Sequence, residues 1–366
     1  MKKLNLSNFG FNILQIETKA ACNMACSFCP YPLKDDKTST LDFESIKRIL
    51  NQVNPKDPKF KYLTFSQFNE PLLDNRIFEI VQYAKNLGFK IYFVTNGLLL
   101  NKSKNVEELI KSKPEIKISL QIIEQGKHQE GRGLNLDLIR YSKTIFDFCN
   151  KVKNTDLKVD IDIGCNFNDN KFKYFLKRFF GLQAGDPSII DNRKKTLKIL
   201  KDFLEEMSKI NENANEMKET FFGLLDQNIL IKKNAQMSDY IFQEGIDLAS
   251  NIKLKIKPFF YGRRIEKFYP ISDNFSCESE ILGILSDGSV VPCCLAYDDT
   301  ISLGNVNNKS NLEEVLNSGK TFLDNLRTKN SLKHDTCKKC FGEPTQRGVI
   351  FRNIYNYLKG TLKLSG

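Results

Sequence analysis

The chain has 366 residues, 41% of them hydrophobic, which is enough for one large α/β domain or a large domain with a smaller partner. Lys and Arg outnumber Asp and Glu by 55 to 44, a formal net charge of +11, but the lysines are scattered and no nucleic-acid-binding motif accompanies them. Neither a run of about 18 apolar residues nor a cleavable apolar signal segment occurs, so we expect a cytoplasmic protein with a solvated basic surface, no membrane span and no nucleic-acid partner.

Strand-like and helix-like segments alternate along the first half of the chain. Short apolar or alternating segments predict strands at Ile13–Glu17, Tyr62–Phe68, Lys90–Thr95, Ile116–Gln121, Leu157–Ile163 and Lys253–Pro258. Helical spacing predicts helices at Leu41–Val53, Asn75–Leu87, Val106–Ser112 and Leu136–Cys149. Repeated βα units favour a parallel sheet, and the predicted fold class is therefore α/β, a partial (β/α)6 TIM-like barrel.

Two regions depart from this rhythm. Residues 166–250 read as a mostly helical insertion, with the clearest helices at Lys194–Ile210 and Asp239–Ser250. The insertion either covers the barrel mouth or packs along its side without touching a substrate. Residues 265–366 form a loop-rich, Cys-rich region, which we expect to be a small metal-stapled domain after a barrel domain of residues 1–264. Only two short helices are predicted there, at Leu312–Ser318 and Lys320–Arg327.

Three cysteines follow the first predicted strand. The chain has 10 Cys and 2 His, and because cytosolic proteins rarely keep structural disulfides, clustered cysteines indicate metal or redox chemistry. Cys22, Cys26 and Cys29 have the spacing C-x-x-x-C-x-x-C. Three thiolates on one loop can bind three irons of a [4Fe–4S] cluster and leave the fourth iron open. Zinc or free thiols are the alternative, but a closed zinc site needs four ligands, and no fourth lies nearby in the sequence.

In this segment the chain resembles the radical S-adenosylmethionine (SAM) superfamily, whose pattern includes an aromatic residue before the last cysteine, here Phe28. The resemblance implies a [4Fe–4S] cluster whose open iron binds SAM. It also implies reductive cleavage of SAM to a 5′-deoxyadenosyl radical that abstracts hydrogen from a substrate, with a low-potential flavodoxin or ferredoxin as electron donor.

The resemblance continues after the second predicted strand. Relatives have a Gly-Gly-Glu-Pro-like segment there, and Glu70 and Pro71 match it. Phe68 and Asn69 replace the two glycines, and such bulkier residues change how closely the backbone approaches a ligand.

The next two strand ends also match the family. Thr95 and Asn96 belong to a Thr-Asn-Gly segment, Ser119 stands at a serine-bearing strand end, and Arg132 lies in the following loop. Taken singly, Thr-Asn-Gly is most often a strand-ending turn and such an arginine is more often a surface residue. Together, the resemblance implies a SAM-binding set of Phe28, Asn69, Glu70, Thr95, Asn96, Ser119 and Arg132.

The second set of cysteines lies near the C-terminus. Gly288 between two apolar pairs predicts a β-hairpin, which delivers Cys293 toward Cys277 and the Cys337-x-x-Cys340 pair. Four thiolates from three segments fit one [4Fe–4S] cluster, although a tetrahedral zinc site stays open as an alternative.

The region after the barrel is similar to the SPASM/twitch auxiliary-cluster domains of the same superfamily. The resemblance implies a second, auxiliary [4Fe–4S] cluster held by Cys277, Cys293, Cys337 and Cys340. No cysteine follows Cys340, as in the shorter twitch form with one auxiliary cluster, and Cys294 is then spare.

Three functional readings are open, of which the resemblance implies the first two. The first is a two-electron oxidation of a carbohydrate or aminocyclitol-type alcohol, with the auxiliary cluster accepting an electron. The second is modification of a ribosomally made peptide, although the first predicted strand begins near Ile13 and leaves no room before it for a leader-binding domain. The third is a non-catalytic metal-binding scaffold. The substrate is a small molecule or a peptide, and the sequence names no catalytic side chain.

Overall fold

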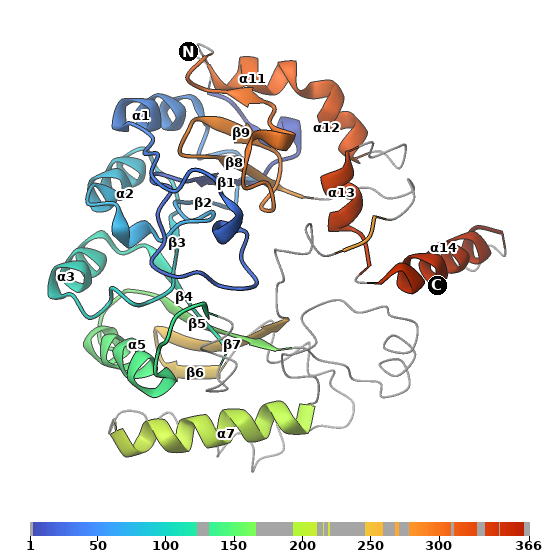
Figure 1. Cartoon of the computed structure of the whole chain (residues 1–366). Coiled ribbons are helices and arrows are strands. Elements are labelled where there is room, and N and C mark those ends of the chain that lie inside the picture. Colours follow the sequence, from blue (N-terminus) through green and yellow to red (C-terminus); the bar gives the residue numbers. More distant parts are fainter. Residues whose placement is uncertain are drawn as a thin grey trace.

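A computed structural model describes most of the barrel and much of the C-terminal region (Figure 1). The described residues are 3–122, 132–165, 193–210, 215, 219, 246–258, 268–270, 277, 279–308, 311–327, 334–343 and 345–361. Within them, no helix is long and apolar enough to cross a membrane.

The strands form two sheets that join into one curved surface. One sheet has the order β10-β9-β8-β1-β2 and the other β3-β4-β5-β7-β6, and a parallel bridge from Leu63 to Ile91 connects β2 to the start of β3. Neighbours among β1, β2, β3, β4, β5 and β7 are parallel, as the predicted partial barrel requires. The strands are β1 (Ile13–Ile16), β2 (Tyr62–Thr64), β3 (Tyr92–Thr95), β4 (Glu115–Gln121), β5 (Val159–Cys165), β6 (Ile246–Ala249), β7 (Ile252–Pro258), β8 (Ile281–Ile284), β9 (Ser289–Val291) and β10 (Gly304–Asn305).

Helices cover the outer face of the barrel strands (Figure 1). The α-helices are α1 (Phe43–Gln52), α2 (Ile77–Asn86), α3 (Ser103–Ser112), α5 (Leu138–Val152), α7 (Arg193–Ile210), α11 (Leu312–Ser318), α12 (Lys320–Arg327), α13 (Asp335–Cys340) and α14 (Gln346–Thr361). Short 3-10 helices are η1 (Leu6–Phe9), η2 (Tyr31–Leu33), η3 (Pro71–Leu73) and η4 (Asp299–Ile301). Asp42 caps α1 by accepting a hydrogen bond from the Ser45 amide, which explains why the helix begins there.

The central strand β4 shows how the sequence pattern places the core. Its residues alternate between buried and half-buried, and Ile116, Ile118 and Leu120 belong to the main apolar cluster together with side chains of α5. The alternate residues, including Lys117 and Ser119, therefore face the inside of the barrel. Hydrophobic alternation thus separates a packed outer face from a polar inner one.

The C-terminal region extends the barrel sheet. β8 pairs in parallel with β1, from Ile13 opposite Ile281 to Ile16 opposite Ile284. β8 and β9 form the predicted hairpin, and Gly288 in its turn has φ +87°, a left-handed conformation that suits glycine. The two predicted domains therefore share one sheet.

Two expectations about secondary structure are wrong, and a third is confirmed. Part of the predicted helix Asp239–Ser250 is the strand β6, which pairs antiparallel with β7; residues 239–245 lie outside the described part. The C-terminal region contains α13 and α14 in addition to the two predicted helices. The helix predicted at Lys194–Ile210 is present as α7, whereas most of the insertion lies outside the described residues.

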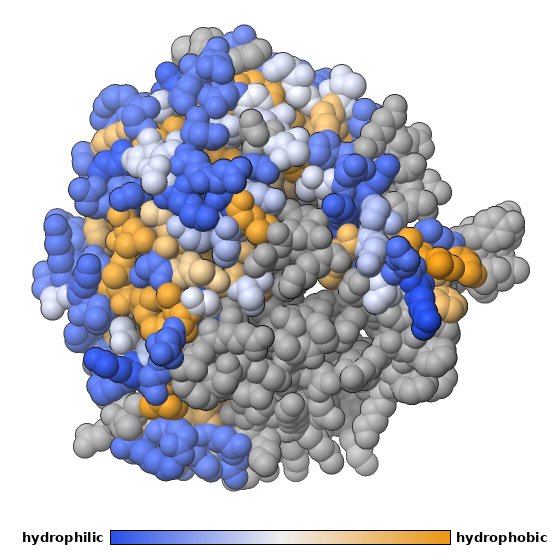
Figure 2. All heavy atoms as spheres, viewed as in Figure 1, coloured by the Kyte–Doolittle hydropathy of each residue, from blue (hydrophilic) through white to orange (hydrophobic). Residues whose placement is uncertain are grey.

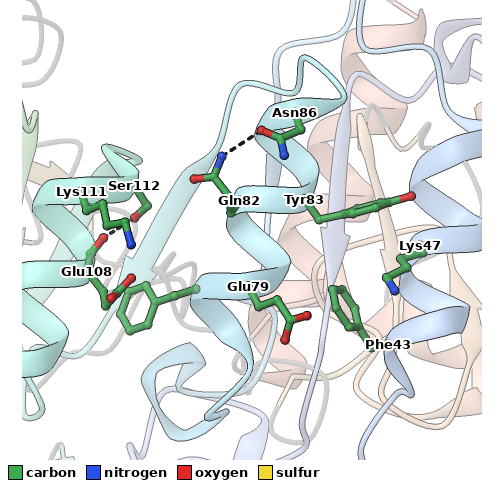
Figure 3. A pocket seen from close by; sticks show the side chains of 10 residues that line it. Phe43, Lys47, Glu79, Gln82, Tyr83, Asn86, Glu108, Lys111 and Ser112 are labelled. Atoms are coloured by element: carbon green, nitrogen blue, oxygen red, sulfur yellow. Dashed lines mark hydrogen bonds between the residues drawn. The ribbon is translucent and has the colours of Figure 1, made fainter.

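Two surface features lie away from the cysteines. Figure 3 shows a cavity of about 610 Å³ on the outer helical layer, where Lys47 of α1 lies 4.4 Å from the ring centre of Phe43. Figure 2 shows apolar side chains on α14, where Ile350 is 56% exposed and Ile354 is 48% exposed. The cavity is lined by residues of α1, α2 and α3 and by no residue of a barrel strand.

Candidate functional site

The N-terminal cysteines lie on a loop between β1 and η2, close to the ends of the barrel strands. Each sulfur accepts an N–H hydrogen bond from the chain. The Tyr31 amide lies 3.4 Å from Cys29 Sγ and Arg132 Nη1 lies 3.4 Å from Cys26 Sγ, while Asn96 Nδ2 lies 3.9 Å from Cys22 Sγ. Such donors stabilise sulfur that carries negative charge, as cluster-bound thiolates do.

The three thiols also lie within electrostatic range of one another. Burial raises the pKa of Cys22 to about 12, and negative charge on Glu70, Cys29 and Cys26 adds to the rise. Among the described residues, no three His, Cys, Asp or Glu side chains are arranged around one metal ion. Cysteine ligands of a [4Fe–4S] cluster each bind a different iron, so three thiols spread along one loop fit such a cluster better than one zinc ion.

Glu70 is buried and joins the ends of two strands. Its carboxylate accepts hydrogen bonds from the Thr95 hydroxyl at 2.8 Å, the Asn96 amide at 2.7 Å and the Leu72 amide at 3.2 Å. Burial raises the pKa of Glu70 to about 7, although these donors favour the charged form. The backbone N–H of Glu70 donates to the Ala21 carbonyl, which ties this strand end to the cysteine loop.

Asn96 lies between the strand end and the cysteine loop. Its side-chain nitrogen Nδ2 donates a hydrogen bond to Asn23 Oδ1 at 2.7 Å and also lies near Cys22 Sγ. Its carbonyl oxygen accepts the hydroxyl of Tyr141 in α5. Asn96 is thus fixed by Asn23 of the cysteine loop and by Tyr141 of α5. No sequence pattern predicted the hydrogen bond from Tyr141.

Arg132 is not a surface residue, because it is only 2% exposed. Besides Cys26, its guanidinium donates to the carbonyls of Ser119 and Leu120 at the end of β4, and it lies 5.6 Å from the ring centre of Phe28. Its Nε is buried without a hydrogen-bond partner within the described part of the chain. Arg132 therefore contacts the cysteine loop, Phe28 and the end of β4, which the sequence analysis predicted as separate parts of the site.

Close backbone packing supports this arrangement. The Ala25 amide donates to the Arg132 carbonyl, and Gly133 follows with φ +66°. A Cβ atom on Gly133 would lie 2.3 Å from the Ala25 carbonyl oxygen, so only glycine fits. At the end of β4 the strand register shifts between Ser119 and Gln121, and Gln121 has φ +59°. This bulge was not expected from the sequence, and bulges commonly lie beside functional sites.

The turn after β2, in which Phe68 and Asn69 replace the family's glycines, is held by hydrogen bonds of the Asn69 side chain. Asn69 Oδ1 accepts the Gln67 amide at 3.0 Å, and Asn69 Nδ2 donates to the Phe65 carbonyl at 3.2 Å. The Asn69 side chain therefore shapes the turn after β2 in the described structure, and its role toward SAM stays a prediction.

The four C-terminal cysteines come from three segments and interact electrostatically. Burial raises the pKa of Cys337 to about 12, and the charges of Cys277 and Cys340 contribute to the rise. Burial also raises the pKa of Cys293, to which the charges of Cys294 and then Cys340 contribute. Cys277 and Cys337 pack in one small apolar cluster with Leu326. The fold thus brings these four cysteines within electrostatic range of one another, and their role as ligands of one cluster stays a prediction.

Cys293 and its neighbour Cys294 differ in their surroundings. Cys293 accepts hydrogen bonds from the amides of Leu295 and Ala296, which stabilise a thiolate, and it lies within electrostatic range of Cys340. Cys294 lies within electrostatic range of Tyr62 in β2. Cys293 is the predicted ligand of the pair, and its role toward a cluster stays a prediction.

A buried ion pair joins both regions and was missed by the sequence analysis. Lys34 Nζ lies 2.6 Å from Glu17 Oε2, and the two side chains are 6% and 0% exposed. The same carboxylate oxygen accepts the amide and hydroxyl of Ser286, in the hairpin turn between β8 and β9. Glu17 precedes the cysteine loop and Lys34 follows it, so the pair closes the loop and attaches it to the C-terminal hairpin. Single charged residues gave no pattern that predicts such a pair.

Two family models match the chain over these regions. A model described as the radical SAM superfamily matches residues 16–179, and one described as an iron–sulfur cluster-binding (SPASM) domain matches residues 276–341. An uncharacterized protein of Methanocaldococcus jannaschii, MJ0804, is 28% identical over 109 residues, which are 30% of this chain and 32% of that protein. The match therefore spans about a third of that relative.

Several solved structures are similar at low identity. BtrN in complex with AdoMet and 2-DOIA is 14% identical, with coverage of 92% of this chain and 93% of that chain and a TM-score of 0.46. SuiB of Streptococcus suis bound to S-adenosylmethionine is 16% identical, with coverage of 83% and 65% and a TM-score of 0.46. The structure of anSMEcpe with bound AdoMet and Kp18Cys peptide is 18% identical, with coverage of 96% and 97% and a TM-score of 0.48.

The family matches cover the cysteine loop with its strand ends and, separately, the C-terminal cysteines. The chain therefore belongs to the radical SAM superfamily of enzymes, which use a [4Fe–4S] cluster and SAM, and it carries a C-terminal SPASM domain for an auxiliary iron–sulfur cluster.

Proposed function

We propose that this enzyme oxidises an alcohol group of a small carbohydrate or aminocyclitol-type molecule by two electrons. When bound, the SAM-binding cluster and SAM supply a 5′-deoxyadenosyl radical, and an auxiliary cluster supplies an electron acceptor. The observation that carries the proposal is that Cys277, Cys293, Cys337 and Cys340, from three segments, lie within electrostatic range of one another. Four protein ligands leave no iron open to a substrate, so this second site suits electron transfer rather than substrate binding.

Besides the alcohol, the proposed reaction consumes one SAM, which yields methionine and 5′-deoxyadenosine, and one electron from an external donor. The alcohol becomes a carbonyl by losing one hydrogen atom from carbon, one proton from oxygen and one electron. The hydrogen atom ends on the 5′ carbon of 5′-deoxyadenosine, the proton goes to solvent, and the electron goes to the acceptor at the C-terminal cysteines. A low-potential flavodoxin or ferredoxin is the proposed donor of the electron that starts each turnover.

The chain's own side chains hold the parts in place. Cys22, Cys26 and Cys29 are the proposed ligands of the SAM-binding cluster, and Arg132 and Asn96 fix their loop through hydrogen bonds to sulfur. The unpartnered Nε of Arg132 supports its proposed place in the SAM site, because a buried donor without an acceptor favours an anionic ligand group.

The complete proposed SAM site lies along neighbouring strand ends, where barrel enzymes bind their ligands. It consists of Phe28, Asn69, Glu70, Thr95, Asn96, Ser119 and Arg132. The Glu70 carboxylate already accepts three hydrogen bonds from the chain, so its proposed contribution is to hold the strand ends in position rather than to bind SAM through its side chain.

Deuterium transfer tests the proposal directly. Anaerobically reconstituted, reduced enzyme is incubated with SAM and a panel of alcohols deuterated at the carbinol carbon. We expect deuterium in 5′-deoxyadenosine and one equivalent of carbonyl product for the true substrate class. A ribosomally made peptide is the alternative substrate; unlabelled 5′-deoxyadenosine across the alcohol panel, together with a mass change in a peptide, would replace the proposal.

A further inference from the structure

The turn after β2 contacts the turn that holds Cys293. Phe68, one of the two residues that replace the family's glycines, is 5% exposed and packs edge-on against Tyr297, with ring centres 6.5 Å apart and planes at 84°. Beside it, Gln67 Nε2 donates to the Ala296 carbonyl at 3.1 Å. Two adjacent residues of the barrel therefore contact two adjacent residues of the C-terminal domain.

Both partners of this contact are fixed by further packing. Gln67 lies against Gly283 of β8, where a Cβ atom would come within 2.7 Å of Gln67 Oε1. In the C-terminal domain, Ala296 makes two hydrogen bonds. Its backbone N–H donates to the Cys293 sulfur, and its carbonyl accepts the hydrogen bond from Gln67 Nε2. The turn that cradles Cys293 is therefore the turn that binds Gln67.

The contact continues to the N-terminal cysteine loop. Gln67 and Asn69 are tied to each other, and Glu70 follows and donates its backbone N–H to the Ala21 carbonyl, next to Cys22. A short path of covalent and hydrogen bonds thus runs from Cys22 through the segment Gln67–Glu70 to Ala296 and Cys293. A glycine at position 68 would remove the Phe68 ring and with it the edge-to-face contact to Tyr297.

We propose that the segment Gln67–Asn69 and the turn Cys293–Tyr297 form an interdomain latch that sets the SAM-binding strand end against the auxiliary-cluster loop, so that SAM binding depends on the C-terminal domain. Phe68 and Tyr297 are its positioning residues. The latch rests on the proposed function, because both cysteine sets must carry clusters for their relative position to matter.

A double-mutant cycle on SAM affinity tests the latch without knowledge of the substrate. The dissociation constant of SAM is measured by anaerobic equilibrium dialysis on the full reconstituted chain as wild type, Phe68→Leu, Tyr297→Leu and the double variant. Edge-to-face aromatic pairs contribute enough that we expect each single variant to bind SAM roughly two- to tenfold more weakly. The double variant should bind no more weakly than the weaker single variant, because both changes remove the same contact.

Two control variants separate the latch from general damage. Tyr297→Phe keeps the ring and should bind SAM as wild type does. Phe60→Leu breaks a similar edge-to-face pair with Phe89, 5.7 Å apart at 72°, and should leave SAM affinity unchanged because that pair touches neither cysteine loop. As an independent readout, Phe68→Leu should alter the electron paramagnetic resonance spectrum of the reduced auxiliary cluster in a Cys22→Ala/Cys26→Ala/Cys29→Ala background.

Three outcomes would overturn the inference or its basis. Wild-type SAM affinity in Tyr297→Leu, with normal iron content, removes the latch and leaves the proposed function intact. Additive losses in the double variant show that the two residues act separately, which also removes the latch. Wild-type enzyme that neither binds nor cleaves SAM removes the proposed function and the latch together.

Discussion

The two cysteine sets are built in different ways. Cys22, Cys26 and Cys29 lie on one short loop, so their chain spacing alone brings their sulfurs near one another. The C-terminal set comes from the segment before β8, the turn after β9 and α13, so only folding brings these sulfurs together. The first site is specified locally and then oriented by distant side chains such as Arg132, whereas the second does not exist before the hairpin and α13 have packed.

The largest expected effect comes from removing the local set. Replacing Cys22, Cys26 and Cys29 by alanine should lower the iron content from about eight to about four per chain, since each [4Fe–4S] cluster holds four irons. SAM cleavage should be lost. Anaerobic iron and sulfide determination with Mössbauer spectroscopy checks both numbers. About four irons falling to none would mean that the C-terminal cysteines hold no cluster, and the electron-acceptor role would be dropped.

The second prediction concerns the assembled set. Cys293→Ser should lower the iron content from about eight to about four, the content of one [4Fe–4S] cluster. The reason is that the Cys293 sulfur accepts two amide hydrogen bonds and lies within electrostatic range of Cys340. Cys294→Ser is the matched control at the neighbouring position and should keep both clusters. Iron content and SAM cleavage without substrate are measured for each. Loss of iron in Cys294→Ser alone would exchange the roles of the two cysteines.

The third prediction breaks the link between the two regions. Lys34→Met leaves the Glu17 carboxylate buried without its cation, and breaking a buried pair in this way costs about 3–5 kcal/mol of unfolding free energy. Denaturant unfolding under anaerobic conditions measures the loss. Replacing both partners, Glu17→Leu with Lys34→Met, should cost less than Lys34→Met alone.

An exposed pair provides the control for that change. Lys113 lies 2.6 Å from Asp156, but the side chains are 51% and 81% exposed. Lys113→Met should leave the unfolding midpoint unchanged, because solvent screens exposed pairs. Equal losses in both lysine variants would show that burial of the Glu17–Lys34 pair does not matter.

The smallest expected effect is a change in pH dependence at Glu70. Its folded pKa, raised to about 7 from 4.5, means that the folded protein binds more protons than the unfolded chain between these values. Unfolding free energy from this group therefore falls as pH rises through that window and levels off above pH about 7. Glu70→Gln should lose this fall, so the difference in thermal midpoint between wild type and variant should change between about pH 5 and about pH 7. A pH-independent difference would place the Glu70 pKa outside that range.

Errors in the predicted elements show where local patterns fail. The alternation in β4 and the helical spacing of α5 are local signals that the core confirms. Residues Ile246–Ala249 looked helical, yet they form β6 because antiparallel pairing with β7 satisfies their backbone. α13 spans only Asp335–Cys340, too few residues for a helical period to show, whereas α14 has Ile350 and Ile354 at helical spacing that the sequence analysis did not use.

The sequence by itself determined the cofactor chemistry and the order of the site: the spacing of Cys22 to Cys29, and polar residues at the ends of successive strands. These features are local, since a few adjacent residues and a strand period define them. Tertiary structure decided the burial of Arg132 against Cys26, the ion pair of Glu17 with Lys34, and the contact of Phe68 with Tyr297. Each of these joins residues far apart in the chain, and such pairings depend on packing of the whole sheet rather than on any pattern along the sequence.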